Sequence, residues 1–193
     1  MRELSLHLLD IAENGVSAGA QNITITIVED LRADRLKLAV EDDGRGMDAA
    51  MVEQVTNPFT TTRTTRKVGL GSPLLKLAAE MCNGSLAVES TPNVGTTVNV
   101  DFQRSHIDRM PLGDMAGTML SLLVGWPQVH WVLCYRVDDE EFVFDDAPIK
   151  EELGDALPLS DPEVIGFLRG ALREGIADVT RRTRGDYVKL AEG

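Results

Sequence analysis

The chain has 193 residues, 43% of them hydrophobic, and a formal net charge of −12. This length supports one full hydrophobic core with an appended lobe. Neither half is basic: residues 1–103 hold 9 Lys and Arg against 14 Asp and Glu, and residues 104–193 hold 10 against 17. The charge therefore argues against direct nucleic-acid binding.

The first residues contain an acid and lack a long apolar stretch, so no signal peptide is predicted. Cys82 and Cys134 lie far apart in the sequence. Their spacing predicts neither a disulfide framework nor a metal site, and favours free thiols in a reducing cytoplasm.

Residues 2–15 are predicted to form an amphipathic helix, because Leu4, Leu8 and Ile11 recur at helical spacing. Asp10 and Asn14 are four residues apart and therefore share a face. A carboxylate and an amide side by side can hold a hydrated Mg²⁺ and orient a water molecule. The alternative is an ordinary polar face on a surface helix.

An alternating apolar run at residues 36–40 predicts a strand, and an acid-rich Gly-x-Gly segment follows it. Gly44 and Gly46 allow a sharp turn and let a flat ligand lie against bare backbone. Asp42 then supplies a fixed acceptor for that ligand. Taken alone, the segment favours an ordinary turn, because Asp-Gly pairs are common in turns.

Residues 57–71 are polar, rich in threonine and without hydrophobic period, so we predict a loop. Gly69 and Gly71 then open a helix, whose free N–H groups suit a phosphate. No acid occurs between Glu53 and Glu80. Basic residues in that window are Arg63, Arg66, Lys67 and Lys76. A polyphosphate ligand explains this basic window, and a solvated flexible loop is the alternative.

Residues 83–102 are predicted to form a hairpin, with Val98, Val100 and Phe102 on one face of its second strand. The four segments, in this order, resemble the N, G1, F and G2 boxes of the GHKL superfamily. Its members include DNA gyrase, Hsp90, histidine kinases and MutL-type ATPases. The resemblance covers residues 2 to about 103.

The resemblance implies the Bergerat fold, an α/β (α+β) two-layer sandwich with a mixed, mostly antiparallel sheet and helices on one face. We expect residues 1–104 to form a histidine kinase-like ATP-binding domain. Residues 105–193 would form a small C-terminal α+β extension. The implied cofactors are ATP and Mg²⁺.

Site roles follow from the resemblance, residue by residue. Asn14 matches the asparagine that coordinates Mg²⁺, and Asp10 stands at the position of the general base. Asp42 matches the acid that accepts the adenine amino group. The remaining matches are Gly44 and Gly46 along the base, Gly69 and Gly71 at the phosphate-contacting lid hinge, Thr96 at the adenine side, and Lys67 or Arg63 at the γ-phosphate.

Two departures from the family pattern are visible. Lys67 occupies the position of the first glycine of the G2 box, which removes flexibility and adds a cation. Asp10 is one methylene shorter than the usual glutamate, and a base must come within hydrogen-bond distance of the proton it takes. Slow hydrolysis is therefore our hypothesis.

The chain begins almost at the N box, so no phosphoacceptor hairpin is expected before it. His7, His106 and His130 are predicted to be structural or surface residues. The chain is similar to stand-alone anti-sigma factor kinases, which phosphorylate a serine or threonine on a partner protein. We expect a signal-transduction kinase or slow ATPase, and the alternative is a non-catalytic, nucleotide-gated protein-binding regulator. Its partner would be of the sigma or anti-sigma, response-regulator or enzyme-maturation type.

The apolar run from Met115 to Tyr135 is long enough to suggest a membrane span, but Gly125 to Gln128 interrupt it. We predict a helix at about 113–125 and a strand at about 129–137 instead. Met115, Met119, Leu122 and Leu123 form an apolar stripe, either for core packing or for docking.

The acidic segment 138–141 is predicted to be the turn of a hairpin. Ser160, followed by Glu163, predicts an N-cap and a helix that runs to about Val179, after which the tail frays. We expect the extension to dock a partner or to form a homodimer.

Overall fold

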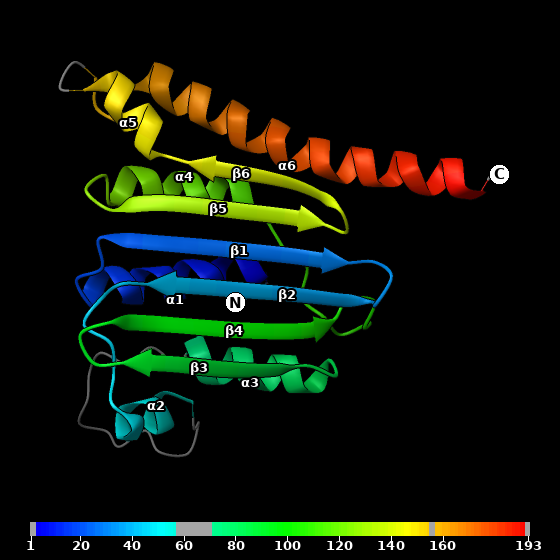
Figure 1. The fold of residues 1–193 in the computed structure, drawn as a ribbon, viewed down its shortest axis with the longest axis horizontal. Helices are drawn as coiled ribbons and strands as arrows, with labels where there is room; N and C mark the ends of the chain where they lie inside the picture. Colours follow the sequence, from blue (N-terminus) through cyan, green and yellow to red (C-terminus); the bar gives the residue numbers. More distant parts are fainter. Residues whose placement is uncertain (1–2, 57–70, 155–156, 192–193) are drawn as a thin grey trace.

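The computed structural model describes residues 3–56, 71–154 and 157–191. Six strands of this part form one sheet, in the order β3-β4-β2-β1-β5-β6 (Figure 1). The strands are β1 (Asn22–Asp30), β2 (Arg35–Asp42), β3 (Ser85–Thr91), β4 (Gly95–Gln103), β5 (His130–Val137) and β6 (Glu140–Asp145). The helices are α1 (Leu4–Ser17), α2 (Ala49–Thr56), α3 (Gly71–Met81), α4 (Met115–Gly125), α5 (Ala147–Leu153) and α6 (Pro162–Ala191).

The sheet is mixed and mostly antiparallel. Four of its strand pairs are antiparallel, and only β1 and β5 run parallel. Helices α1, α3 and α4 lie behind the sheet in Figure 1 and cover one face. The predicted two-layer fold class is confirmed.

Strand β1 shows why the helices cover this face. Ile23, Ile25 and Ile27 alternate with polar residues and are at most 1% exposed. Side chains alternate between the two faces of a strand, so the isoleucines all point into the same core. From the helix layer, Leu4, Leu8 and Ile11 of α1 are buried in that core, as their spacing predicts.

The segment after residue 104 adds to the same sheet. Its strand β5 pairs with β1 along its whole length, from His130 beside Asn22 to Val137 beside Glu29. In α4 the apolar stripe is buried, which confirms core packing: Met115, Met119, Leu122 and Leu123 are at most 3% exposed. One sheet thus contains strands from both sides of residue 104. The domain boundary expected at that residue stays a prediction.

Helix α6 differs from its prediction at both ends. It begins at Pro162, so the cap position belongs to Asp161, whose Oδ1 accepts a hydrogen bond from the Glu163 N–H at 2.8 Å. Ser160 as the N-cap is therefore wrong. The helix continues to Ala191, well beyond the predicted end at Val179.

Strand β1 and helices α2 and α5 were not among the predicted elements. Cys82 and Cys134 are free thiols, as predicted. Within residues 3–56, 71–154 and 157–191, no helix combines the length and apolarity needed to cross a membrane.

Candidate functional site

A cavity of about 570 Å³ opens between α1, α2 and the ends of strands β2 and β4. Asn14 from α1, Asp42 from β2, Gly46 from the following turn and Thr96 from β4 all line it. These four residues were predicted as site residues from separate segments, and the fold brings them to one cavity. Its apolar lining comes from Ile11, Met47, Met51, Val55, Val88 and Val98.

Asp42 is the half-buried acceptor of this cavity. Its Oδ1 accepts a hydrogen bond from the Gly44 N–H at 2.9 Å. Burial raises the pKa of Asp42, and the nearby charge of Asp43 adds to this, while backbone hydrogen bonds from Gly44 and Thr96 act in the opposite direction. A carboxylate with incomplete solvation gains from a ligand that brings an N–H donor.

Gly44 and Gly46 are required by close contacts. A Cβ on Gly46 would lie 2.0 Å from the Thr91 carbonyl oxygen, and its φ of +62° also favours glycine. A Cβ on Gly44 would lie 2.8 Å from Asp42 Oδ1. These glycines let the turn fold tightly around the acceptor.

Two residues of the site were missed by the sequence analysis. Gly15 lets α1 approach β2, because its Cβ would lie only 3.0 Å from that of Asp42. Ser90 Oγ accepts from the Met47 N–H at 2.7 Å and donates to the Gly95 carbonyl at 2.9 Å. The sequence offered a signal for Gly15, because a glycine directly after Asn14 inside a helix is unusual. It offered no signal for Ser90.

The Ser90 hydroxyl also contacts Thr96. The two hydroxyl oxygens lie 2.9 Å apart, and either can be the donor. Thr96 lines the cavity beside Asp42, with which it is paired in the sheet.

Asp10 lies one helical turn before Asn14 on α1, but it is not among the residues that line the cavity. Gly71 is the first residue of α3. Arg63, Lys67 and Gly69 lie outside the described residues. The described part of the site thus contains the residues expected at the base and Mg²⁺, without the expected lid cations.

The donor set of the cavity fits an adenine nucleotide. Asp42 and Thr96 both line the cavity and can accept hydrogen bonds, as an exocyclic amino group would require, and the apolar lining suits an aromatic base. Asn14 offers an amide oxygen, a ligand type that Mg²⁺ accepts. A bound Mg²⁺ would neutralise phosphate charge there.

Comparisons with known proteins agree with this architecture. A solved structure described as the N-terminal domain of a DNA repair protein is similar over 91% of this chain and 57% of that one, with a TM-score of 0.53 and 12% identity. This likeness concerns the fold. It extends past residue 104 and so includes strands contributed by the extension.

Curated relatives match a shorter part. The sensor protein DegM of Bacillus sp. (strain B21-2) is 31% identical over 91 residues, which are 47% of this chain and 24% of DegM. The virulence sensor protein BvgS of Bordetella bronchiseptica is 27% identical over 115 residues, 56% of this chain and 9% of BvgS. The chain thus spans a quarter or less of these relatives.

A family match covers the N box through the second strand of the predicted hairpin. Residues 2–106, more than half of the chain, match the family described as histidine kinase-, DNA gyrase B- and HSP90-like ATPases. Membership of this family implies nucleotide binding, in agreement with the cavity. The chain therefore belongs to the histidine kinase-, DNA gyrase B- and HSP90-like ATPase family.

Proposed function

We propose that this protein is a cytoplasmic regulator that binds Mg²⁺-ATP and transfers the γ-phosphate to a partner protein, with slow hydrolysis when the partner is absent. The observation that supports it most is the meeting of Asn14, Asp42, Gly46 and Thr96 in one cavity. They come from three separate segments, and together they supply the contacts that a base and a metal-bound phosphate need.

In this proposal Asp42 and Thr96 bind the adenine, and Gly46 lets the base approach the backbone. Asn14 binds the Mg²⁺ that neutralises the phosphates. Asp10, one turn away on α1, orients the acceptor hydroxyl or water. The last step requires the acceptor to approach α1 from the open side of the cavity.

The first experiment is a calorimetric titration of the protein with ATP, with and without Mg²⁺. We expect saturable binding that is tighter with Mg²⁺, because Asn14 acts through the metal. The complex is then incubated with γ-labelled ATP, and labelled phosphate is expected on an added partner or, slowly, in solution. Absence of ATP binding would refute the proposal.

Substituting Asp42 by Asn is expected to weaken ATP binding by about 1.5–3 kcal/mol, roughly 10- to 150-fold, because a charge-assisted hydrogen bond is lost. The amide can also rotate to donate, so the preference for ATP over GTP should shrink, since guanine carries an oxygen where adenine carries the amino group. Titration of wild type and variant with both nucleotides measures these changes. Unchanged ATP affinity and selectivity would contradict the adenine assignment.

Stability provides the control for this variant. Burial raises the pKa of Asp42, so the fold disfavours its ionised form at neutral pH. Replacement by a neutral amide should therefore not lower the thermal midpoint. In the wild type, ATP affinity should begin to fall at a pH above the ordinary carboxyl pKa of 3.8, as Asp42 takes up its proton. A folded variant with weakened binding identifies a contact rather than a structural role.

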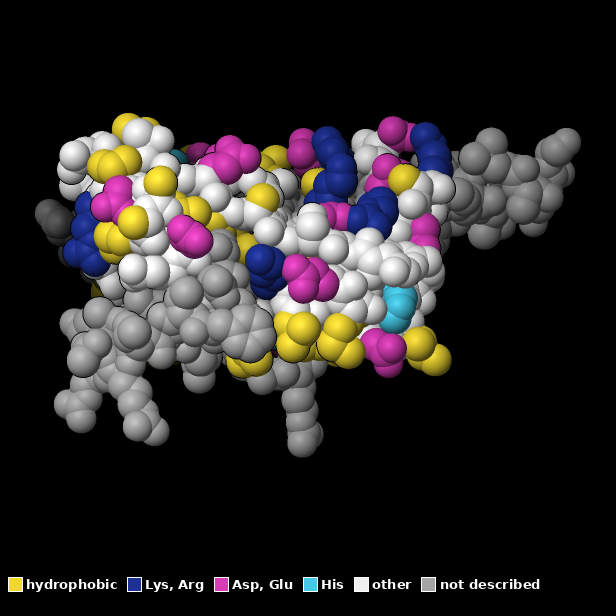
Figure 2. All heavy atoms as spheres, turned by 90° about the horizontal axis from the view of Figure 1, so that it is seen from below, with side chains coloured by type: hydrophobic (Ala, Val, Ile, Leu, Met, Phe, Trp, Pro, Cys, Tyr) yellow, Lys and Arg dark blue, Asp and Glu magenta, His cyan; other side chains and the backbone are white. Residues whose placement is uncertain are grey.

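The second candidate function is a nucleotide-gated regulator that binds a protein without phosphate transfer. The position of Asp10 outside the cavity lining favours it. So does the apolar surface of α2 and α3, where Met51, Leu74, Leu77 and Met81 are 44–61% exposed. Figure 2 shows hydrophobic side chains on this side of the molecule. Such a surface suits a protein partner.

A further inference from the structure

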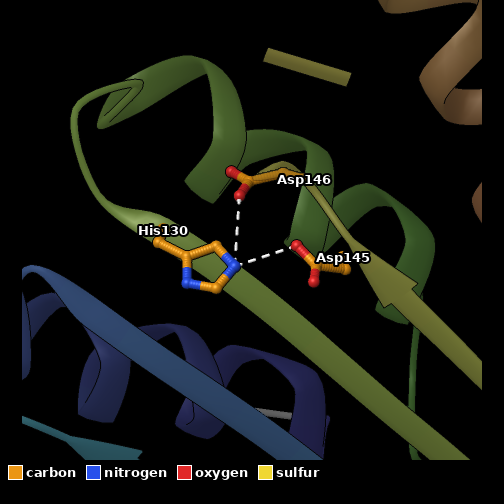
Figure 3. Close-up of side chains that lie close together, drawn as sticks. All are labelled: His130, Asp145 and Asp146. Atoms are coloured by element: carbon orange, nitrogen blue, oxygen red, sulfur yellow. Dashed lines mark hydrogen bonds and ion pairs between the residues drawn. The ribbon is translucent and has the colours of Figure 1, made fainter. Parts of the chain in front are cut away.

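A second group of polar side chains lies where the extension joins the sheet. His130 begins β5, Asp145 ends β6, and Asp146 follows it, so the two adjacent strands bring the three together (Figure 3). His130 Nε2 lies 2.8 Å from Asp145 Oδ1 and 4.0 Å from Asp146 Oδ1. One ligand atom from each residue lies within 4.8 Å of the other two.

The hydrogen bonds behind His130 determine its tautomer. Asn22 Nδ2 donates to Asp43 Oδ2 at 2.6 Å, so the amide oxygen of Asn22 faces the other way. That oxygen lies 3.0 Å from His130 Nδ1 and can only accept. Nδ1 must therefore carry a proton, which leaves Nε2 as the ring nitrogen that faces the two carboxylates (Figure 3).

Either a proton on Nε2 or a metal ion that takes its place can stand between this nitrogen and the carboxylates. This arrangement, a histidine with Nε2 free and Nδ1 hydrogen-bonded to an oxygen, is the one that metal-binding histidines adopt. Asn22 would thus act behind the ligand, and Asp43 behind Asn22. Asp43 is in turn held by the backbone N–H groups of Gln21 and Asn22, at 2.7 and 2.9 Å.

Both carboxylates accept hydrogen bonds, and Asp146 is held more firmly than Asp145. Asp146 is fully buried; its Oδ1 accepts from the Trp131 N–H at 3.0 Å, and its Oδ2 lies 2.6 Å from Lys150 Nζ. Asp145 Oδ1 accepts from the Ala147 N–H at 2.8 Å. Lys150 balances the charge of Asp146, and Asp145 is left to face His130 Nε2 or a metal ion bound to that nitrogen.

We propose that His130 Nε2, Asp145 Oδ1 and Asp146 Oδ1 bind a divalent first-row transition-metal ion such as Zn²⁺, with water completing its coordination and the ion replacing any proton on Nε2. One imidazole nitrogen and two carboxylate oxygens suit this class of metal. Tetrahedral bonds of about 2.0–2.2 Å place ligand atoms roughly 3.3–3.5 Å apart. The half-exposed Asp145 can make this adjustment by rotating its side chain.

Such an ion would tie the extension to the nucleotide-binding part of the sheet. His130 and the two aspartates belong to the extension, whereas Asn22 and Asp43 belong to the segment that matches the ATPase family. Asp43 directly follows Asp42, the acceptor in the cavity. Metal binding would therefore stiffen the joint beside the nucleotide site.

The test uses the full chain without an affinity tag, stripped of metal by a chelator and then titrated with Zn²⁺ in a calorimeter at neutral pH. We expect one ion per chain and a rise in the thermal midpoint. His130→Gln and Asp145→Asn should each lower Zn²⁺ affinity at least about tenfold. Asp145→Asn keeps an oxygen for the Ala147 N–H, so the fold should survive. Asn22→Ala should lower affinity by about 10- to 100-fold, the range for residues behind a metal ligand.

His106→Gln is the matched control. His106 Nδ1 also lies near a carboxylate, 4.0 Å from that of Asp108, but it belongs to no three-residue group of metal ligands among the described residues. Its loss should leave Zn²⁺ binding unchanged. The proposal is overturned if wild type shows no saturable Zn²⁺ binding, in which case the positive centre is a proton on His130. It is equally overturned if binding is indifferent to both His130→Gln and Asp145→Asn.

Discussion

Replacing Asp10 by Asn should slow loss of the γ-phosphate by about 10²–10⁴-fold, the usual contribution of a general base, while ATP affinity stays nearly constant. Asp10 is not among the residues that line the cavity, so we expect the loss of its charge to change nucleotide binding little. The amide can still hydrogen-bond but cannot take a proton at neutral pH. Single-turnover transfer of labelled phosphate, with calorimetry on the same samples, separates the two effects.

Glu13→Gln is the matched control for this variant, because it removes an acid from the same helix, three residues further on. It should leave transfer unchanged. Asp10→Glu restores the longer side chain usual in the family and should raise turnover. If Asp10→Asn and Asp10→Glu both leave the rate unaltered while a partner still responds to ATP, the nucleotide-gated regulator is the better description.

Replacing Phe144 by Ala should destabilise the whole protein by about 3–5 kcal/mol, the usual loss for a buried phenylalanine. Phe144 is 6% exposed, lies on β6 and is paired with Leu133 of β5. For a chain of this size the thermal midpoint should fall by roughly 6–20 °C. The ATP-binding part should unfold in the same transition, because β5 and β1 belong to one sheet.

The control variant replaces another phenylalanine of the same extension. Phe167 on α6 is 65% exposed, so Phe167→Ala should change stability by no more than about 0.5 kcal/mol. Trp126 and Trp131 are the only two tryptophans and both lie in the extension, so fluorescence reports on it while circular dichroism reports on the whole chain. Two separate transitions, or equal effects of the two variants, would contradict a single cooperative unit.

Much of the fold could be predicted because short-range patterns coincide with recognisable motifs. The alternation at 36–40 and the glycines around Arg45 define a strand that ends in a ligand-binding turn. Helical spacing of Leu4, Leu8 and Ile11 places Asn14 beside that turn. In each case the information lies within about ten residues, which is the range over which secondary-structure periods operate.

Other features could not be predicted because they depend on contacts between distant segments. His130 was expected to be a structural or surface residue, and only the strand pairing reveals the two carboxylates opposite it. The polar sequence after Thr180 suggested fraying, yet α6 continues. Thr183 is buried there, and its Oγ1 lies 3.0 Å from the Val179 carbonyl oxygen of the same helix and 3.3 Å from the Val137 carbonyl oxygen of β5, a contact that the local sequence does not encode. Ser90 became a site residue only through its bonds to the next strand.

The parallel pairing of β1 with β5 affects how the chain must fold as it is made. Asn22 and His130 meet in the finished sheet although 108 positions separate them in the sequence. At about 5–20 residues per second, the ribosome needs roughly 5–20 s to supply the second strand after the first. During that interval the backbone groups on one side of β1 are open to pairing with another chain. Strand β1, which lies in the middle of the finished sheet, is thus exposed to pairing with another chain during synthesis.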